Sequence, residues 1–249
     1  MPISLLTTKL YTPALHRTII VRSRLIERLE NGLSQGRPLT LISASAGFGK
    51  TTLITDWLRQ NKHPAAWLSL DDGDNDPIRF WRYVIAALQT IEVGWGSTAL
   101  AILSAPQLPP LESVVTLLIN DLAAAPGPII LVIDDYHFIT EQQIHASLDF
   151  FLDRLPPRLQ VVIATREDPP LSLPRRRSRS ELTEVRASDL RFTLTESTEF
   201  LNALMRLNLV NADIEALEQR TEGWAAGLRL AGLSLQGRSD QHDFIAAFA

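Results

Sequence analysis

The sequence predicts an α/β fold built on a five-stranded, mainly parallel sheet and followed by a small all-helical part. Five apolar runs, each too short to be a helix, alternate with segments in which apolar residues recur at helical spacing. Such alternation is typical of parallel sheets whose strands are joined by helices. From residue 195 onward the spacing is helical throughout and predicts no further strand. The five runs begin at Leu39, Ala65, Pro128, Leu159 and Glu181.

The composition fits a globular chain with a large core and excludes several classes of protein. Of 249 residues, 45% are hydrophobic and 21% charged, so we expect one large domain or a core domain with a smaller appendage. No apolar run of roughly 18 residues predicts a membrane span, and the N-terminus has no signal-peptide pattern. The absence of cysteine excludes disulfides and cysteine-based metal sites, and it suits the cytoplasm. A net charge of −4 gives no overall basic footprint for nucleic acid.

The first 20 residues, with scattered apolar side chains and with Pro2 and Pro13, predict an extended arm. Residues 19–29 then form an amphipathic pattern that places Leu25, Ile26 and Leu29 on one face. We expect this second segment to be a helix that covers an edge of the sheet.

The first apolar run leads into a glycine-bearing loop and then a helix. Residues 39–42 predict a buried strand, and residues 52–58 are typical of a helix. Between them lies Ala44-Ser-Ala-Gly-Phe-Gly-Lys-Thr51. This context favours a phosphate-binding loop, because glycine backbones can turn successive N–H groups toward an anion. The usual first glycine of the pattern is Ala44 here, and an ordinary glycine-rich turn with a solvated lysine is the alternative.

Each part of the loop has a chemical task in the phosphate-binding interpretation. The N–H groups around Gly47 and Gly49, together with the positive dipole end of the next helix, would hold phosphate oxygens. Lys50 would reach the β- and γ-phosphates, and the Thr51 hydroxyl would ligate Mg²⁺. The nucleotide-binding residues predicted from this loop are Ala46, Gly47, Phe48, Gly49, Lys50, Thr51 and Thr52.

An acidic loop, Asp71-Asp-Gly-Asp-Asn-Asp76, follows the second apolar run. A metal site or a direct catalytic role is one interpretation of these carboxylates. Turn and capping chemistry is the other, because Asp76 precedes Pro77 in the order that starts a helix. Residues 94–110, beyond that helix, predict a loop or a frayed region.

The third run, residues 128–136, carries two carboxylates near its C-terminal end. Its continuous apolar residues predict a central parallel strand that is buried on both faces. Ligands of open α/β sheets bind beyond the carboxyl ends of the strands, so Asp134 is placed to hold Mg²⁺ through water or Thr51. Asp135 is placed to orient and polarise an attacking water molecule.

The helix after these carboxylates offers them an alternative role as caps. Thr140 and Gln143 already form a capping-box pattern at the start of that helix, however. We therefore expect Asp134 and Asp135 to have a chemical role instead.

The fourth run ends in Thr165 and Arg166, at the sheet edge where a γ-phosphate would lie. A guanidinium there could bond the γ-oxygens and register whether they are present. A surface salt bridge is the alternative role for Arg166.

The stretch Arg175-Arg-Arg-Ser-Arg-Ser180 invites a nucleic-acid interpretation. A short basic stretch after several prolines is more often solvated surface, so we expect an exposed loop and no DNA contact. The last strand and then the helical part follow. We divide the chain into a nucleotide-binding domain over residues 1–192 and a helical lid over residues 193–249. Because the chain ends inside an apolar, helix-like segment, we expect a module cut from a longer protein.

Taken in order, these stretches resemble the signal-transduction (STAND-class) P-loop NTPases with an additional-strand (ASCE-type) sheet, which include the plant-resistance and apoptotic nucleotide switches. More narrowly, the chain is similar to the N-terminal ATPase module of large LuxR-type, MalT-like transcriptional activators. The phosphate loop alone is a weak signal, whereas the series of matches spans nearly the whole chain in the family's order. The matching pieces are Lys9-Leu10 with Pro13, Val21–Leu25, Ser43–Leu53, Leu68–Asn75, Leu131–His137, Leu190–Thr193 and Gly223–Leu228.

The resemblance implies further roles for named residues. Val21 and Arg22 would line the adenine, and Arg166 would sense the γ-phosphate. Trp224 would start a helix that closes over the base, although related switches often have a proline where this chain has Ala225. The family's inducer-binding and DNA-binding domains lie outside this sequence, so DNA would be contacted only through a C-terminal domain absent here.

We therefore predict an ATP/ADP switch that gates self-association of a transcription activator. ATP and Mg²⁺ would bind through Lys50, Thr51 and Asp134, and slow hydrolysis would reset the switch. Lys50, Asp135 and Arg166 form the predicted catalytic set. A small-molecule or nucleotide kinase is the rival enzyme, and it would need an acceptor pocket with positioned basic groups. A nucleotide-free structural scaffold is the third interpretation.

Overall fold

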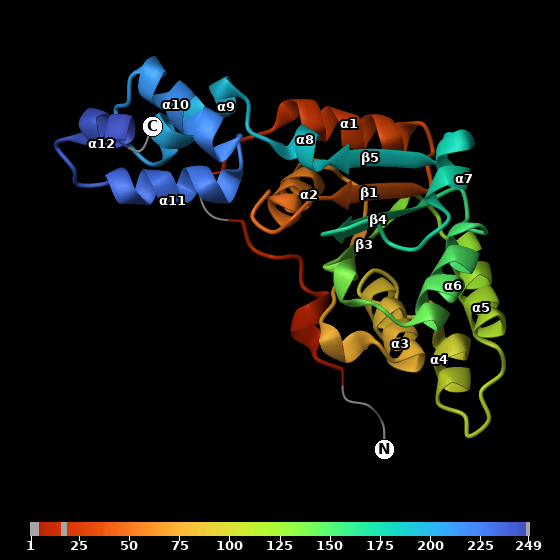
Figure 1. Cartoon of the computed structure of the whole chain (residues 1–249). Coiled ribbons are helices and arrows are strands. Elements are labelled where there is room, and N and C mark those ends of the chain that lie inside the picture. The colour runs from red at the N-terminus through yellow and green to blue at the C-terminus, as the bar shows by residue number, and fades with distance from the viewer. Residues whose placement is uncertain (1–4, 16–18, 248–249) are drawn as a thin grey trace.

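The computed structural model describes residues 5–15 and 19–247 and contains a parallel sheet with helices on both faces (Figure 1). The five strands lie in the order β2-β3-β4-β1-β5, and every pairing between them is parallel. Because parallel neighbours need a crossover connection, every link between successive strands contains at least one helix. The strands are β1 (Leu39–Ser43), β2 (Ala65–Ser69), β3 (Ile129–Asp134), β4 (Leu159–Thr165) and β5 (Leu182–Arg186).

The helices alternate with these strands up to residue 190, and the remainder of the described chain is helical. The α-helices are α1 (Ser23–Ser34), α2 (Lys50–Gln60), α3 (Pro77–Leu88), α4 (Ser97–Leu103), α5 (Leu111–Ala123), α6 (Gln142–Leu152), α7 (Leu173–Ser178), α8 (Ala187–Leu190), α9 (Leu194–Thr198), α10 (Asn211–Thr221), α11 (Ala225–Leu235) and α12 (Gln241–Ala247). Short 3-10 segments are η1 (Thr7–Leu10), η2 (Asp72–Asp74) and η3 (Tyr136–Phe138), and η4 (Glu199–Leu204) is a π-helical segment.

The two faces of the sheet have separate hydrophobic clusters. Helices α1 and α2 cover one face, where Trp57 of α2 packs with residues from β1 to β5. Helices α3 to α6 cover the other face. Every residue of β1, β3 and β4 is buried, as expected for strands covered on both sides.

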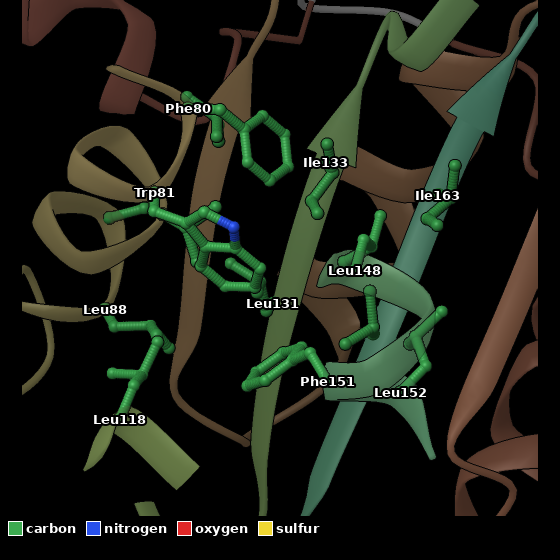
Figure 2. Packing of buried hydrophobic residues seen from close by; sticks show 14 of the residues in the cluster. Phe80, Trp81, Leu88, Leu118, Leu131, Ile133, Leu148, Phe151, Leu152 and Ile163 are labelled. Carbon is green, nitrogen blue, oxygen red and sulfur yellow. The ribbon is translucent and has the colours of Figure 1, made fainter. Parts of the chain in front are cut away.

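The larger cluster is packed around aromatic rings, as Figure 2 shows. Trp81 of α3 lies edge-on to Phe80 and to Phe151 of α6, with ring centroids 5.5 Å apart in both pairs. The Trp81 indole N–H donates to the Ser147 hydroxyl at 2.9 Å, so its polar group is satisfied in the core. These contacts join α3 to α6 on the face of the sheet that they cover.

The N-terminal arm is tied to the acidic loop after β2. Its described residues include η1, from which Lys9 forms ion pairs with Asp74 at 2.5 Å and Asp71 at 2.7 Å. Asp74 is fully buried and also pairs with Arg79, while Asp76 caps α3 by accepting from the Arg79 N–H. Turn, capping and ion-pair chemistry therefore account for this loop. Residues 1–4 and 16–18 of the predicted arm lie outside the described residues.

The arginine-rich stretch is not the solvated loop that we predicted. It forms most of α7, and the Arg176 side chain is fully buried against Asp149 and Asp153 of the α6 segment, at 2.7 Å from each. Arg175 pairs with Asp153, and Arg177 pairs with Glu184 of β5. The predicted loop is a helix, and the predicted solvation was wrong for Arg176, because carboxylates distant in the sequence neutralise it and let it pack against the fold. The other residues of the stretch are exposed, as predicted.

Other predictions of local structure differ in position. Helix α4 lies inside the predicted loop over 94–110, and α1 begins at Ser23 with the preceding four residues non-helical. Glu141, in place of Thr140, caps α6 by accepting from the Gln143 N–H at 3.1 Å. Thr140 is instead held by Asn75. Strand β3 is interior, but β4 is the middle strand of the sheet.

Residues 193–247, which we call the helical region, have a third hydrophobic cluster. That cluster also includes Ile20 and Phe192, so two segments outside the helical region help to form its core. In Figure 1 the helical region lies beside α1 and the start of α2. No helix in the described part of the chain is long and apolar enough to cross a membrane.

Candidate functional site

The carboxyl ends of β1, β3 and β4 meet at one edge of the sheet. In the parallel register Ser43 of β1 aligns with Thr165 of β4, and the tip of β3 is Asp134. The loop after β1, the acids after β3 and the arginine after β4 are therefore neighbours, although more than eighty residues separate Ser43 from Asp134. Such an edge is where open α/β sheets bind ligands.

The phosphate loop uses glycine where other residues would be strained. Gly47 and Gly49 have φ values of 81° and 79°, in the left-handed region. A Cβ on Gly47 would also lie 2.6 Å from the Ala226 Cβ, whereas one on Gly49 would meet nothing within 4 Å. Helix α2 begins directly after Gly49, so its free N–H groups face the loop.

Lys50 is buried at the start of α2 and is held by the loop itself. Its ammonium donates to the carbonyl of Ala44 at 2.7 Å and to that of Ser45 at 3.1 Å. Burial holds the pKa of Lys50 below its ordinary value, although the charges of Asp135 and Asp134 oppose this shift. Ala44 is buried beneath the loop, and its carbonyl serves Lys50 despite the missing glycine.

Thr51 and Asp134 lie together, as the sequence predicted. The Thr51 hydroxyl donates to an Asp134 carboxylate oxygen at 2.8 Å. The Asp134 residue is only 3% exposed, and burial, with a smaller effect of the Asp135 charge, raises its pKa to about 6. A buried carboxylate beside a hydroxyl is a pair of oxygen ligands for a hard divalent cation.

The side-chain oxygens of Thr51 and Asp134 fit a Mg²⁺ ion that is also bound by a phosphate. Among the described residues no group of three or more histidine, cysteine, aspartate or glutamate side chains is arranged to hold a metal. Mg²⁺ commonly takes one or two protein oxygens and completes its shell with water and substrate phosphates. Thr51 and Asp134 supply that number of ligands next to the phosphate loop.

Asp135 has a different environment from Asp134. It is in the left-handed region with φ 58°, and its backbone N–H donates to an Asp134 oxygen at 2.9 Å. Its carboxylate is 42% exposed and lies 3.8 Å from the His137 Nδ1. Neither acid caps α6, because Glu141 does so.

Arg166 follows β4 directly and is exposed. Within residues 5–15 and 19–247 it is in no ion pair, so the salt-bridge alternative is not observed there. Its charge is close enough to oppose protonation of Lys50 and His137. Its guanidinium is therefore free to meet an anion near the phosphate loop.

A cavity of about 500 Å³ lies between the phosphate loop, α2 and the helical region. Its walls are mostly apolar, with a few polar side chains, as in many sites for small ligands. Residues that line it include Ile19, Ile20, Arg22, Gly49, Thr52, Asp56, Phe192, Met205, Ala226 and Arg229.

The structure separates the two residues that we expected to line the adenine. Arg22 is buried at the cavity, where it donates to the Leu190 carbonyl at 2.6 Å and stands over the Phe192 ring. Val21 is 47% exposed and does not line the cavity.

Trp224 contacts the phosphate loop and does not line the cavity. It precedes α11, and its indole N–H donates to the Ala46 carbonyl at 3.0 Å. Its ring lines a second hollow with Phe48 and Gly227, while Ala225 and Ala226 line the cavity. The Ala226 N–H also donates to the Gly47 carbonyl at 3.1 Å.

Sequence reasoning assigned no role to His137, Phe192 or Ala226. His137 lies two residues after Asp135 in the sequence, and this nearness was the signal that could have identified it. Phe192 and Ala226 reach the site only through the packing of the helical region, which no local pattern reveals.

No family model matches the chain. The HTH-type transcriptional regulators MalT of Yersinia enterocolitica and Cronobacter sakazakii are 37% and 38% identical to it over 230 residues. These alignments cover 92% of this chain, which spans about a quarter (25%) of the length of these curated relatives.

Two solved structures have a similar fold. A Walker-type ATPase of Pyrococcus abyssi superposes with a TM-score of 0.58 at 18% identity, over 90% of this chain and 69% of that one. Cdc6p from Pyrobaculum aerophilum has a TM-score of 0.57 at 14% identity, over 96% of this chain and 67% of that one. At such identities the likeness concerns the fold alone. The chain thus has a P-loop-type α/β fold and is similar in sequence to about a quarter of the length of the MalT regulators.

Proposed function

We propose that this chain is an ATP/ADP-dependent switch, in which bound ATP with Mg²⁺ promotes self-association and slow hydrolysis reverses it. The observation that carries the proposal is the hydrogen bond between Thr51 and Asp134, 2.8 Å long, next to the buried Lys50. A hydroxyl, a carboxylate and an ammonium at the mouth of a glycine loop match the needs of a Mg²⁺-bound triphosphate.

The residues divide the work in this proposal. Backbone N–H groups over residues 46–52 hold the phosphates, and Lys50 neutralises the β- and γ-oxygens. Thr51 and Asp134 would hold Mg²⁺, and the ion would supply positive charge next to those oxygens. The cavity beside Arg22 receives the base, and the helical region covers it.

Hydrolysis would depend on Asp135 and would be slow. Asp135 orients the attacking water, and Arg166 contacts the γ-phosphate and so registers its presence. P-loop nucleotide switches with an internal arginine turn over at about 10⁻² per second. We expect ATP hydrolysis here at a rate of that order or lower. Slow turnover suits a switch, because the ATP state must persist long enough to assemble.

The regulatory output is proposed from the relatives. They are named as HTH-type transcriptional regulators, and this chain matches a quarter of their length. We propose that DNA is contacted by a C-terminal domain outside these residues, and that the present residues divide into a nucleotide-binding domain (1–192) and a helical lid (193–249).

Thermal unfolding with and without Mg-ATP tests nucleotide binding directly. Ligand at about a hundred times its Kd should stabilise the chain by about 2.7 kcal/mol. Lys50→Ala should abolish this gain, whereas Lys62→Ala, an exposed lysine just beyond α2, should keep it. A wild-type chain that gains nothing from ATP or ADP would identify a nucleotide-free scaffold.

Two further measurements separate the switch from its rivals. Phosphate release should be independent of added small-molecule acceptors, whereas a kinase would consume ATP faster with its acceptor. Sedimentation should show larger species with ATP than with ADP. Equal association in both nucleotides would contradict the switch.

A further inference from the structure

His137 is buried beside the acids of β3 and has no hydrogen-bond partner on either ring nitrogen. Its side chain is only 10% exposed. Buried polar groups in folded proteins are nearly always paired, and an exception calls for a specific explanation. The tyrosine before it shows the usual case, because the Tyr136 hydroxyl bonds to the His145 ring at 2.8 Å.

The backbone holds the His137 ring in a fixed place. Residue 137 is the centre of η3, which is closed by hydrogen bonds from Phe138 to the Asp135 carbonyl and from Ile139 to the Tyr136 carbonyl. The segment lies against β4, and the ring stacks on Phe138 with centroids 4.4 Å apart. The ring therefore presents its nitrogens from a rigid support.

The carboxylate that we assign to hydrolysis lies near the ring. The His137 Nδ1 and the Asp135 Oδ1 are 3.8 Å apart, which is too long for a hydrogen bond. Catalytic hydrogen bonds are often long before the substrate binds and tighten in the complex. Asp135 needs such support, because its carboxylate is partly exposed on a left-handed residue.

The ring is suited to donate one hydrogen bond and not to act as a fixed cation. Burial holds the pKa of His137 below its ordinary value, and the charges of Arg166 and Lys50 act in the same direction. A neutral imidazole carries one N–H donor and one acceptor. The N–H on Nδ1 can therefore bond to Asp135 without neutralising it.

We propose that His137 is a positioning residue for hydrolysis, whose Nδ1–H closes on Asp135 and holds that carboxylate toward the attacking water. This inference rests on the function proposed above. It assigns a role to a residue that contacts neither the phosphate loop nor the metal ligands in the described hydrogen bonds. Its chemistry is positioning only, and no proton leaves the ring in the step.

Kinetics of His137→Phe tests the role. Phenylalanine keeps a ring that can stack on Phe138 but removes both nitrogens. We expect kcat for ATP hydrolysis to fall by about 10- to 100-fold, a size typical of lost supporting contacts, with Kd values for ATP and ADP nearly unchanged. His63→Asn is the matched control, because His63 lies before β2 at the opposite edge of the sheet.

Two amide variants identify the nitrogen that acts. In His137→Asn the amide nitrogen takes approximately the place of Nδ1, and in His137→Gln it takes approximately that of Nε2. We expect Asn to restore most of the lost kcat and Gln to restore little. In an Asp135→Ala background, His137→Phe should cause no further loss, because both changes remove the same interaction.

A spectroscopic measurement tests the contact without turnover. Ring ¹⁵N signals of His137, recorded with Mg²⁺ and a non-hydrolysable ATP analogue, should shift in Asp135→Ala, which removes the acceptor. Glu167→Gln is the control, because it removes a nearby negative charge and leaves the acceptor in place. Equal ¹⁵N shifts in both variants would mean that only the lost charge matters. That result would overturn the proposed hydrogen bond between His137 and Asp135.

The outcomes separate this inference from the function beneath it. A wild-type chain that hydrolyses no ATP would overturn both. A chain that hydrolyses ATP while His137→Phe behaves like the control would overturn the inference and leave the switch intact. A fall in kcat matched by an equal fall in nucleotide affinity would also overturn it. If the Phe variant does not fold, the Asn and Gln variants and the ¹⁵N signals decide.

Discussion

The sheet and the helical region of this protein are built differently. Every residue of β1, β3 and β4 is buried, and the acids and the phosphate loop stand at their ends. Helices α10 and α11 each have eleven residues and bury only three of them. In the function proposed above, the reacting groups would need a fixed frame, whereas a lid that moves with the nucleotide would need contacts that can be exchanged.

The two regions are joined by polar contacts at a few points. Trp224 and Ala226 donate to carbonyls of the phosphate loop, and Arg24 pairs with Glu196 at 3.1 Å. Each neutral hydrogen bond contributes on the order of 1 kcal/mol. Such contacts can reorganise when the loop binds a phosphate. The contrast between the two regions leads to four predictions.

The largest effect is expected at Arg166, the proposed link between nucleotide state and assembly. Arg166→Ala should leave ADP affinity nearly intact and abolish ATP-dependent association. A change from 1:99 to 99:1 between two states needs about 5.5 kcal/mol of differential binding, and Arg166 is our candidate for part of it. Sedimentation in ATP and ADP measures the result, with Arg179→Ala, an exposed arginine near β5, as the control. Equal loss of ADP affinity would argue against a sensor.

The contact between the two regions is tested at Gly47. Gly47→Ala places a Cβ 2.6 Å from Ala226, whereas Gly49→Ala places one in open space at nearly the same φ. Both variants bear left-handed strain, so their difference isolates the contact, and we expect about 1 to 3 kcal/mol less stability for Gly47→Ala. Urea unfolding of the nucleotide-free chain measures this. Equal stabilities of the two variants would mean that the helical region moves away from the new Cβ without a loss of stability.

The sheet should respond to acid through Glu184 on β5. Hydrogen bonds from Arg177 and then Arg186 lower its pKa to about 2, from 4.5. A lowered carboxyl pKa contributes stability above pH 4.5 that is lost as the pH falls toward 2. Allowing for partial exposure, we expect about 1 to 2 kcal/mol. Glu184→Gln should remove this part of the acid transition, and Glu215→Gln, exposed on α10, should not.

The stability of the helical region should depend on pH in the opposite direction, and more weakly. A hydrogen bond from His242 of α12 to Asp213, 2.7 Å long, raises the pKa of the exposed histidine above 6.5. A raised histidine pKa contributes stability below 6.5 that is lost as the pH rises through the folded value. Amide hydrogen exchange in α12, corrected for intrinsic rates, should therefore become faster as the pH rises through the folded-state pKa of His242. His242→Asn should remove the dependence, and a dependence that persists would contradict this assignment.

Some of the site could be predicted because its signals are local. The strand-loop-helix pattern around Gly47 and the apolar run that ends in Asp134 are each contained in about ten residues. Parallel strands then bring their carboxyl ends to one edge, so the meeting of Thr51 with Asp134 followed from topology.

The predictions that were wrong concern residues whose surroundings are set by distant parts of the chain. A stretch of arginines is solvated by default, but Arg176 is buried because two aspartates of the α6 segment receive it. Thr140 fits a capping pattern, but Asn75 binds it and Glu141 caps the helix instead. Val21 and Arg22 are adjacent in sequence, and only the packing of Phe192 and α11 shows which of them faces the cavity.

Local sequence signals were enough to predict the alternation of strands and helices, the glycine-bearing loop and the acid-tipped strand, because apolar periodicity and glycine act over a few residues. Contacts between distant parts of the chain set the order of strands, the burial of Arg176, the contact of Trp224 with the loop and the place of His137 beside Asp135. These depend on which surfaces exclude water from one another, and that is settled only when residues far apart in the chain are packed together.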